Sequence, residues 1–460
     1  MTNKKRIGIV ASIVTAVVLL GIGSVTFYQL SSVRSAHAAR AFTAHYLSKS
    51  HMPYIKLPNQ KPASGSGLFS CQANNAPVRC YSPQQIRTAY DINRVLKKGI
   101  QGQGQTIVII DAYQSPTITQ DLSQFNHLFG LQNSTLNIIA PNGLTPFDPN
   151  DPNQVGWAGE ITLDVEWSHA IAPLATIDLV LAPSNADTDL LSVTEYAVNH
   201  NLGDVISQSF GEAESCADPN LLAQEHQVFK QAVSQGMTVF ASSGDDGAAQ
   251  PTCDGSSAFL SASTPASDPL VTGVGATSLN ASQSYGKYLG ETAWNDQFGA
   301  SGGGFSTLYK RPHYQTGSNL GSNWRGVPDV AYNGDVNGGV LTVWGSSGYG
   351  PGLVFIFGGT SAGSPQWAAM LTLVDQTFGR QGFINTTLYR GFAAAGGFFH
   401  DITSGNNTFD GVNGYNTRPG WDAVTGWGSF DLGNSFFGPA GSTLTVNRWG
   451  NAAAHSIASV

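Results

Sequence analysis

The chain has 460 residues, of which 11% are charged and 54 are glycine, and its formal net charge is −8. A chain of this length can bury a large core and allows two or three domains, whereas the acidic balance argues against a nucleic-acid partner, so we expect none. Few charges and many glycines favour a loop-rich extracellular globular protein over a cytosolic one.

The first 38 residues have the pattern of a signal peptide. A basic start, MTNKKR, precedes an apolar run from Ile7 to Tyr28, and Ala36 and Ala38 then form an A-x-A cleavage pattern. We therefore expect residues 1–38 to be removed and the protein to be secreted into the extracellular space. The apolar run is also long enough to span a bilayer, so an uncleaved anchor, with the membrane as a partner, is the alternative.

The four cysteines suit an exported protein. They allow three pairings, of which we expect the nearest-neighbour one, Cys71 with Cys80 and Cys216 with Cys253. A metal site is the weaker interpretation, because the spacing is not C-x-x-C and no histidine pair accompanies it.

The order of elements predicts the fold class. Residues 39–78 are polar and rich in Gly, Ser and Pro, which is typical of a linker or a short pro-segment. Order is expected to begin near Ser82 and Pro83, a helix N-cap followed by a proline in the first turn. Apolar runs then alternate with amphipathic patterns, which predicts an α/β fold with a mostly parallel sheet and helices on both faces, in one large domain over residues 79–440 with a tail at 441–460. The expected strands are 105–113, 175–183, 204–210 and 237–244, and the expected helices are 118–130, 189–200 and 220–236.

One candidate nucleophile lies in the stretch GGTSAGSP, residues 358–365. It follows the apolar run 353–357 and precedes the helical pattern 365–378, so a turn of small residues would expose Ser361 beside backbone N–H groups. The alternative is an ordinary tight turn with Ser or Thr as the N-cap. Because Ser361 and Asp245 both follow strand-like runs, we expect both at the carboxyl edge of the sheet, where ligands bind.

Two carboxyl groups four residues apart form a candidate proton acceptor. In GWAGEITLDVEWSHAIAP, a helix would place Glu160 and Asp164 on one face. A solvated acidic face is the alternative, but the apolar neighbours leave little surface to solvate. A partly buried carboxyl pair would share a proton and could accept one at acid pH.

A third candidate is Asp245, in ASSGDDGA after the apolar run MTVF. Ionised, this side chain would repel an oxyanion, whereas protonated it could donate a hydrogen bond to one. The alternative is an ordinary Asx turn.

Together these motifs resemble those of the sedolisins, the serine-carboxyl peptidases, over about residues 81–432. The marks are GTSAGSP around Ser361, E-x-x-x-D at Glu160 and Asp164, and SGD at Asp245. The resemblance implies a subtilisin-like fold and hydrolysis of proteins or peptides at acid pH, as an endopeptidase or a tripeptidyl-peptidase. It further implies that Ser361 is the nucleophile, Glu160 the general base and acid, Asp164 its orienting partner and Asp245 the oxyanion donor. We expect a monomer.

The resemblance also implies one structural calcium ion near the C-terminus. Asp401 in DITSGNN and Asp422 in PGWDAVTGWG match its two halves, with backbone oxygens from Ile402, Arg418 and Gly420. Arg418 stands where the family usually has glycine, which worsens the charge balance around a cation. A second departure is that sedolisins usually carry a long pro-domain, for which residues 39–79 are too short.

Three rival hypotheses stay open at this point. A conventional subtilisin would need a histidine base; Asp111 could mimic its first Asp, but His169 lacks the flanking glycines. A secreted, catalytically inactive binding module would not need the complete set of catalytic side chains that is present. A serine esterase would match G-x-S-x-G at 359–363 but would require a later histidine, for which His400 and His455 are the candidates.

Overall fold

The computed structural model describes residues 48, 52–62, 68–73, 75–316, 320–392, 397–438 and 449. The predicted signal peptide or anchor lies outside these residues, as does all of the expected tail except Trp449. Among the helices described, none combines the length and the apolar character needed to cross a membrane.

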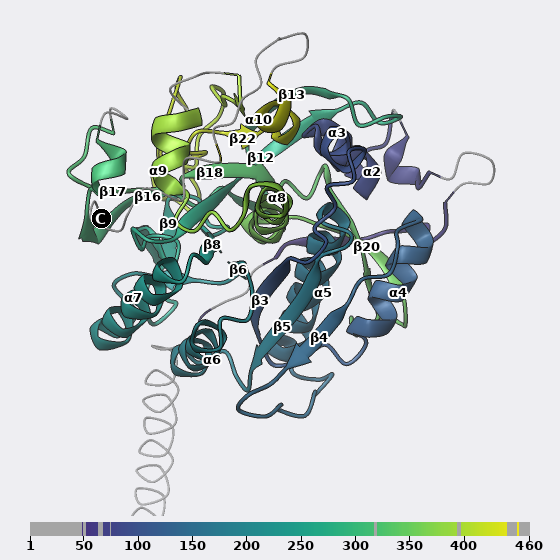
Figure 1. The fold of residues 1–460 in the computed structure, drawn as a ribbon, viewed down its shortest axis with the longest axis horizontal. Coiled ribbons are helices and arrows are strands. Elements are labelled where there is room, and N and C mark those ends of the chain that lie inside the picture. The colour runs from purple at the N-terminus through teal and green to yellow at the C-terminus, as the bar shows by residue number, and fades with distance from the viewer. Residues whose placement is uncertain are drawn as a thin grey trace, which may run out of the picture. The chain divides into compact units, whose positions relative to one another are not determined.

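An eight-stranded sheet forms the centre of the fold, in the order β13-β12-β8-β6-β3-β5-β4, with β18 also paired to β12. All neighbours run parallel except β12 and β13. Figure 1 shows β3, β5 and β4 side by side. The strands are β3 (Thr106–Ala112), β4 (Leu136–Ile139), β5 (Thr176–Ala182), β6 (Val205–Gln208), β8 (Thr238–Ser242), β12 (Thr272–Ala281), β13 (Tyr288–Ala293) and β18 (Val330–Asn333).

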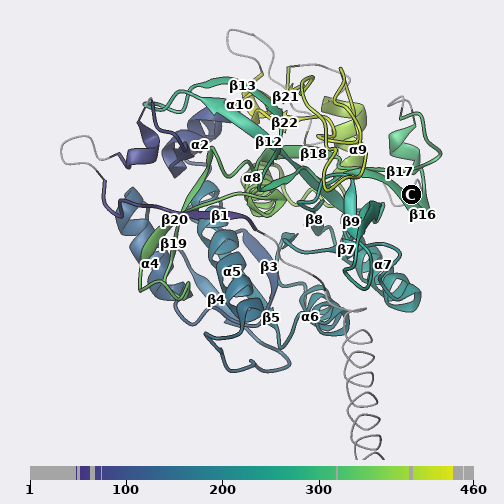
Figure 2. The ribbon, with the colours of Figure 1, turned by 180° about the vertical axis from the view of Figure 1, so that it is seen from behind.

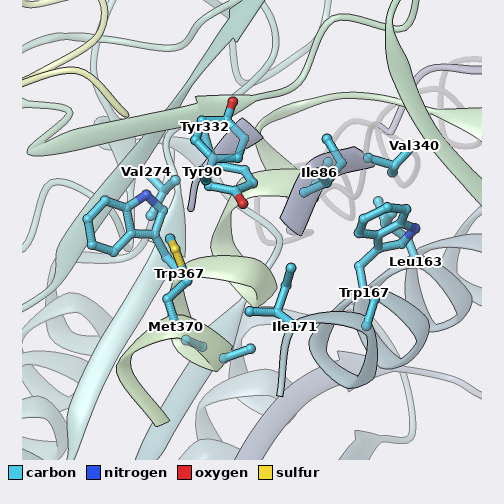
Figure 3. Close-up of a cluster of buried hydrophobic side chains, with 14 of the residues drawn as sticks. Ile86, Tyr90, Leu163, Trp167, Ile171, Val274, Tyr332, Val340, Trp367 and Met370 are labelled. Carbon is cyan, nitrogen blue, oxygen red and sulfur yellow. The ribbon is translucent and has the colours of Figure 1, made fainter. Parts of the chain in front are cut away.

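Helices cover both faces of this sheet, as the alternating pattern predicted. Alternate residues of β3 show the two sides: Ile107 and Ile109 belong to one hydrophobic cluster, and Val108 and Ile110 to another. The first cluster contains the apolar faces of α5 and α8, part of which Figure 3 shows, and the second contains those of α6 and α7. The helices are α4 (Ile118–Phe129), α5 (Pro152–Ile171), α6 (Asp187–Asn199), α7 (Pro219–Ser234) and α8 (Gly363–Phe378).

The predicted helix start at Ser82 is confirmed. Helix α2 (Pro83–Ala89) has Ser82 as its N-cap, proline in its first turn and a capping box with Gln85. The helical pattern is interrupted at Asp91, whose φ of 54° is left-handed, and resumes as α3 (Ile92–Leu96).

A second sheet changes two expectations. Strand β20 (Leu353–Phe357), which precedes Ser361, is not part of the parallel sheet but pairs antiparallel with β19 (Gly339–Trp344) in the order β1-β20-β19-β2. The pattern of an apolar run does not indicate which sheet the strand joins. The sequence therefore could not distinguish a strand of the parallel sheet from a strand of this second sheet. Regular structure also begins before Ser82, because β1 (Tyr54–Lys56) lies within the stretch expected to be a linker or pro-segment. The role of that stretch as a linker or pro-segment stays a prediction.

Both predicted disulfides are confirmed. The Cα atoms are 5.3 Å apart in Cys71–Cys80 and 5.2 Å apart in Cys216–Cys253, both within the usual range. The remaining elements are short: η2 (Ser70–Gln72), β2 (Cys80–Tyr81), β7 (Glu212–Ala213), β9 (Ala249–Pro251), β10 (Ala258–Leu260), β11 (Ser263–Thr264), β14 (Asn295–Asp296), β15 (Gly299–Ala300), β16 (Gly304–Lys310), η3 (His313–Gln315), β17 (Trp324–Val327), η4 (Thr360–Ala362), α9 (Asn385–Thr387), η5 (Leu388–Phe392), β21 (Phe399–His400), β22 (Ser429–Phe430) and α10 (Leu432–Phe437).

Candidate active site

Ser361 lies in a strand–turn–helix unit. Strand β20 ends at Phe357, the single turn η4 contains Ser361, and α8 follows directly. Gly359 has a φ of 89°, a conformation that glycine adopts at little cost. Ser361 is only 4% exposed. The serine is therefore held on the turn at the head of a buried helix.

Asp245 is bound to the same turn. The backbone N–H and the hydroxyl of Thr360 both donate to Asp245 Oδ1, each over 2.7 Å, and the Thr360 hydroxyl accepts from Gly244 N over 3.1 Å. Burial raises the pKa of Asp245 to about 7, although the two Thr360 bonds lower it. Its other oxygen, Oδ2, is buried and has no hydrogen-bond partner among the described residues. A protonated Asp245 thus has an oxygen available to donate a hydrogen bond.

Three buried carboxyl groups lie together on the other elements of the site. Glu160 and Asp164 are on α5, as predicted, and Asp111 is near the end of β3; all three are fully buried. Burial first, and then the charge of Glu160, raise the pKa of Asp111 well above its usual value. Burial and the charges of Asp111 and Glu160 raise the pKa of Asp164 likewise, whereas the Ser209 hydroxyl, which donates to Asp164 Oδ1 over 3.1 Å, lowers it. Because these pKa values are raised, the three carboxyl groups together carry fewer than three negative charges near neutral pH.

Asp111 is the residue that the sequence analysis did not assign to this group. There, Asp111 is named only as a residue that could correspond to the first Asp of a conventional subtilisin. Its position after the apolar run TIVII is the same signal that singled out Asp245, so the sequence contained a clue. The parallel pairing of β3 with β5 and the packing of α5 against β3 bring it to Glu160.

Helix α5 also connects the carboxyl group to the serine turn. It packs against both η4 and α8, and the Ser168 hydroxyl donates to the backbone oxygen of Pro365 over 3.4 Å. Ser361, the carboxyl group on α5 and β3, and Asp245 thus lie on elements that are far apart in the chain but linked by packing and hydrogen bonds. This combination suits proton transfer from a hydroxyl and stabilisation of an oxyanion.

The histidines of the rival hypotheses lie elsewhere in the fold. His169 is buried near the end of α5, where burial lowers its pKa to about 4. His400 lies on β21, stacked on Tyr288 at 3.7 Å between ring centroids. Within the described part of the chain, no hydrogen bond joins either histidine to Ser361. His455 lies outside the described residues.

The five residues predicted as calcium ligands are brought to one loop region. Gly420 N lies 3.2 and 3.0 Å from the two oxygens of Asp401, and Arg418 N donates to Asp422 Oδ2 over 3.0 Å. Ile402 is buried beside Asp401. Burial raises the pKa of Asp422 to about 6.

This loop offers oxygen donors of the kind that calcium prefers. The described residues contain no group of three or more His, Cys, Asp or Glu side chains placed to hold a metal, so backbone oxygens would have to complete the coordination. Asp422 Oδ1 already accepts bonds from Val424 N, Thr425 N and the Thr425 hydroxyl, which leaves Oδ2 as its freer oxygen. The side-chain oxygens of this loop are those of Asp401 and Asp422, and both carboxylates already accept backbone N–H groups, from Gly420 and Arg418.

Comparisons with known proteins give one consistent result. Residues 155–390 match the subtilase family, Peptidase_S8. Kumamolisin from Bacillus sp. (strain MN-32) is 34% identical over 390 residues, which cover 82% of this chain and 66% of the relative. Sedolisin from Pseudomonas sp. (strain 101) is 30% identical over 405 residues, covering 83% and 63%. The chain thus spans about two thirds of the length of these curated relatives.

Among solved structures, Pseudomonas sedolisin, described as a serine-carboxyl proteinase complexed with two molecules of pseudo-iodotyrostatin, superimposes with a TM-score of 0.68. The two chains are 30% identical, and the match covers 77% of this chain and 96% of the other.

Proposed function

Because the chain belongs to the sedolisins, the serine-carboxyl peptidases of the subtilase family, we propose that it is a secreted peptidase that hydrolyses peptide bonds at acid pH. The observation that carries the proposal is the set of carboxyl groups around the serine turn. Asp245 is bonded to Thr360, next to Ser361, and α5, which bears Glu160 and Asp164, packs against the same turn. The two disulfides suit secretion.

In the proposed mechanism, the Ser361 hydroxyl attacks the carbonyl carbon of the scissile peptide bond while Glu160 takes its proton. Asp164 holds Glu160 in position. The tetrahedral oxyanion accepts a hydrogen bond from the protonated Asp245. Glu160 then returns the proton to the leaving amine, and water hydrolyses the acyl-enzyme by the same steps in reverse.

The direction of the pH dependence follows from Asp245. Its pKa of about 7 keeps it protonated in acid, where it can donate to the oxyanion. As the pH rises through 7 the proton is lost, and the carboxylate then repels the developing negative charge. Activity is therefore expected below neutrality and should decline toward pH 8.

We also propose one structural calcium ion in the loop formed by Asp401, Ile402, Arg418, Gly420 and Asp422. The two carboxylates and three backbone oxygens would hold it, and the ion would supply only cross-linking of two chain segments. None of the steps above involves it.

The decisive experiment is hydrolysis of a denatured protein between pH 2 and pH 8. The wild type should be active only in acid, and Ser361→Ala and Glu160→Gln should each abolish activity. Glu195→Gln, an exposed glutamate on α6, is the matched control and should change nothing. Activity above neutrality that survives Glu160→Gln would favour a subtilisin or an esterase. A complete lack of hydrolysis at every pH would favour a binding module.

A further inference from the structure

One edge of the second sheet is completed by side chains rather than by a strand. Strand β19 pairs with β20 over Val340–Trp344. On its other side, β2 is the one described strand that pairs with it, and it does so at Gly339 and Val340. From Leu341 onward this side of β19 lies against helices α4 and α5, which Figure 2 shows beside β19 and β20.

Two adjacent side chains of α5 bind this edge. The Trp167 indole N–H donates to Leu341 O over 3.1 Å, and Val343 N donates to Glu166 Oε2 over 2.9 Å. All four residues are fully buried. Because Leu341 and Val343 are alternate residues of the strand, their backbone groups point to the same edge. Glu166 and Trp167 therefore take the place of a neighbouring strand.

The helix that makes these bonds also carries the proposed base. Glu166 is two residues after Asp164 and six after Glu160. At about 3.6 residues per turn, Glu166 lies roughly 200° round the helix axis from Asp164. Asp164 accepts from Ser209, which follows β6 of the parallel sheet, whereas Glu166 binds β19. Helix α5 thus presents the base pair on one side and binds the second sheet on the other.

The strand that receives these bonds is paired with the strand that leads to the nucleophile. Strand β20 ends at Phe357, four residues before Ser361. Glu160 and Ser361 therefore come from separate elements of the fold. Their separation depends on how α5 lies against the pair formed by β19 and β20.

Glu166 can hold this position in acid without a buried charge. Burial raises its pKa well above the usual value; the bond from Val343 lowers it, and the charge of Asp121 on α4 raises it further. In acid the side chain is therefore neutral, and a neutral oxygen accepts the Val343 N–H. Glutamine has an oxygen acceptor in the same place and no charge, so it reproduces this form.

We propose that Glu166 is a positioning residue of the peptidase. Its bond to Val343, together with the bond from Trp167, fixes α5 against β19. This contact sets the separation of the base Glu160 from the nucleophile Ser361. The role, which rests on the proposed function, includes no contact with substrate and no proton transfer.

The test compares two replacements of Glu166 in the full chain, with peptide hydrolysis measured between pH 2 and pH 6. Glu166→Leu leaves the Val343 N–H without its acceptor, so kcat should fall at least about tenfold with KM unchanged, since a misplacement of about 1 Å can cost roughly 100-fold. Glu166→Gln keeps an oxygen for this N–H, so kcat and its pH profile should match those of the wild type. A wild-type kcat in Glu166→Leu overturns the role. A loss in Glu166→Gln as large as in Glu166→Leu also overturns it, because the proton rather than the bond would then be needed.

Asp121→Leu is the matched control. Gly345 N donates to Asp121 Oδ2 over 2.9 Å, so this carboxyl binds the same edge of β19. It does so from α4, which carries none of the proposed catalytic residues. Asp121→Leu should lower Tm, as Glu166→Leu does, but leave kcat unchanged. An equal fall of kcat in both variants would mean that β19 only needs a covered edge, which overturns the role of α5.

Trp167→Phe tests the same contact without removing a buried carboxyl. It keeps an aromatic ring but loses the N–H that donates to Leu341 O, so kcat should fall about threefold, within the range that one neutral hydrogen bond contributes. If circular dichroism shows that Glu166→Leu does not fold, this variant decides, and an unchanged kcat overturns the role. An active wild type with unaffected variants refutes only the positioning role, whereas a wild type without hydrolysis at any pH refutes the proposed function as well.

Discussion

Replacement of Asp245 by asparagine should remove a defined part of the pH dependence of stability. Asparagine keeps an oxygen that can accept the two Thr360 bonds, and it stays neutral at every pH. In the wild type, burial raises the pKa of Asp245 from 3.8 to about 7. The folded state therefore holds this proton more tightly than the unfolded state, so the stabilisation is complete below pH 4 and is lost as the pH rises to 7.

The size of the effect follows from the same two pKa values. Their difference corresponds to about 4 kcal/mol of unfolding free energy lost by the wild type between about pH 4 and pH 7. Asp245→Asn should not lose this amount. Relative to the wild type, the variant should gain about 4 kcal/mol on going from pH 3.5 to pH 7.5, while the other buried carboxyls contribute equally to both proteins.

Urea unfolding at the two pH values measures this difference, with both proteins in the Ser361→Ala background to prevent autolysis. Asp254→Asn, at a fully exposed aspartate, is the control and should show no such gain. If Asp245→Asn changes the unfolding free energy by the same amount at both pH values, Asp245 titrates normally, and its role as a neutral donor in acid is refuted.

Three further predictions concern the turn, a disulfide and the calcium loop. Gly359→Ala should lower kcat at least tenfold with a modest loss of stability, because a Cβ there overlaps Asp245 Oδ2 in a backbone conformation with φ 89°. Steady-state kinetics and thermal unfolding measure the two effects. An unchanged kcat would contradict the tight contact. Loss of the Cys216–Cys253 disulfide should lower the free energy of unfolding by about 4 kcal/mol, measured by urea unfolding of the double serine variant. Its 37-residue separation restricts the unfolded chain more than the nine-residue separation of Cys71–Cys80 does. A smaller loss than on removal of Cys71–Cys80 would contradict this. Removal of calcium by a chelator should lower the Tm of the wild type, and added calcium should restore it. Asp401→Asn should not respond to added calcium. An equal change in Tm in the wild type and in Asp401→Asn would exclude this loop as the calcium site.

The sequence was most informative where the evidence is local. The period of apolar residues predicted strands β3, β5, β6 and β8 and helices α4, α6 and α7 close to their observed bounds. The cap at Ser82 followed from residue types within one turn. The disulfide pairing also came from closeness in the chain.

What only the tertiary structure decided depends on partners distant in the chain. The assignment of β20 to a separate antiparallel sheet, with β1 as its neighbour, required knowing which strands meet. The placing of Asp111 beside Glu160 required the packing of α5 on β3, and the raised pKa of Asp245 required its burial in the folded chain. A residue type and its spacing specify which chemistry is available, whereas burial and long-range contacts set the pKa and determine which groups act together.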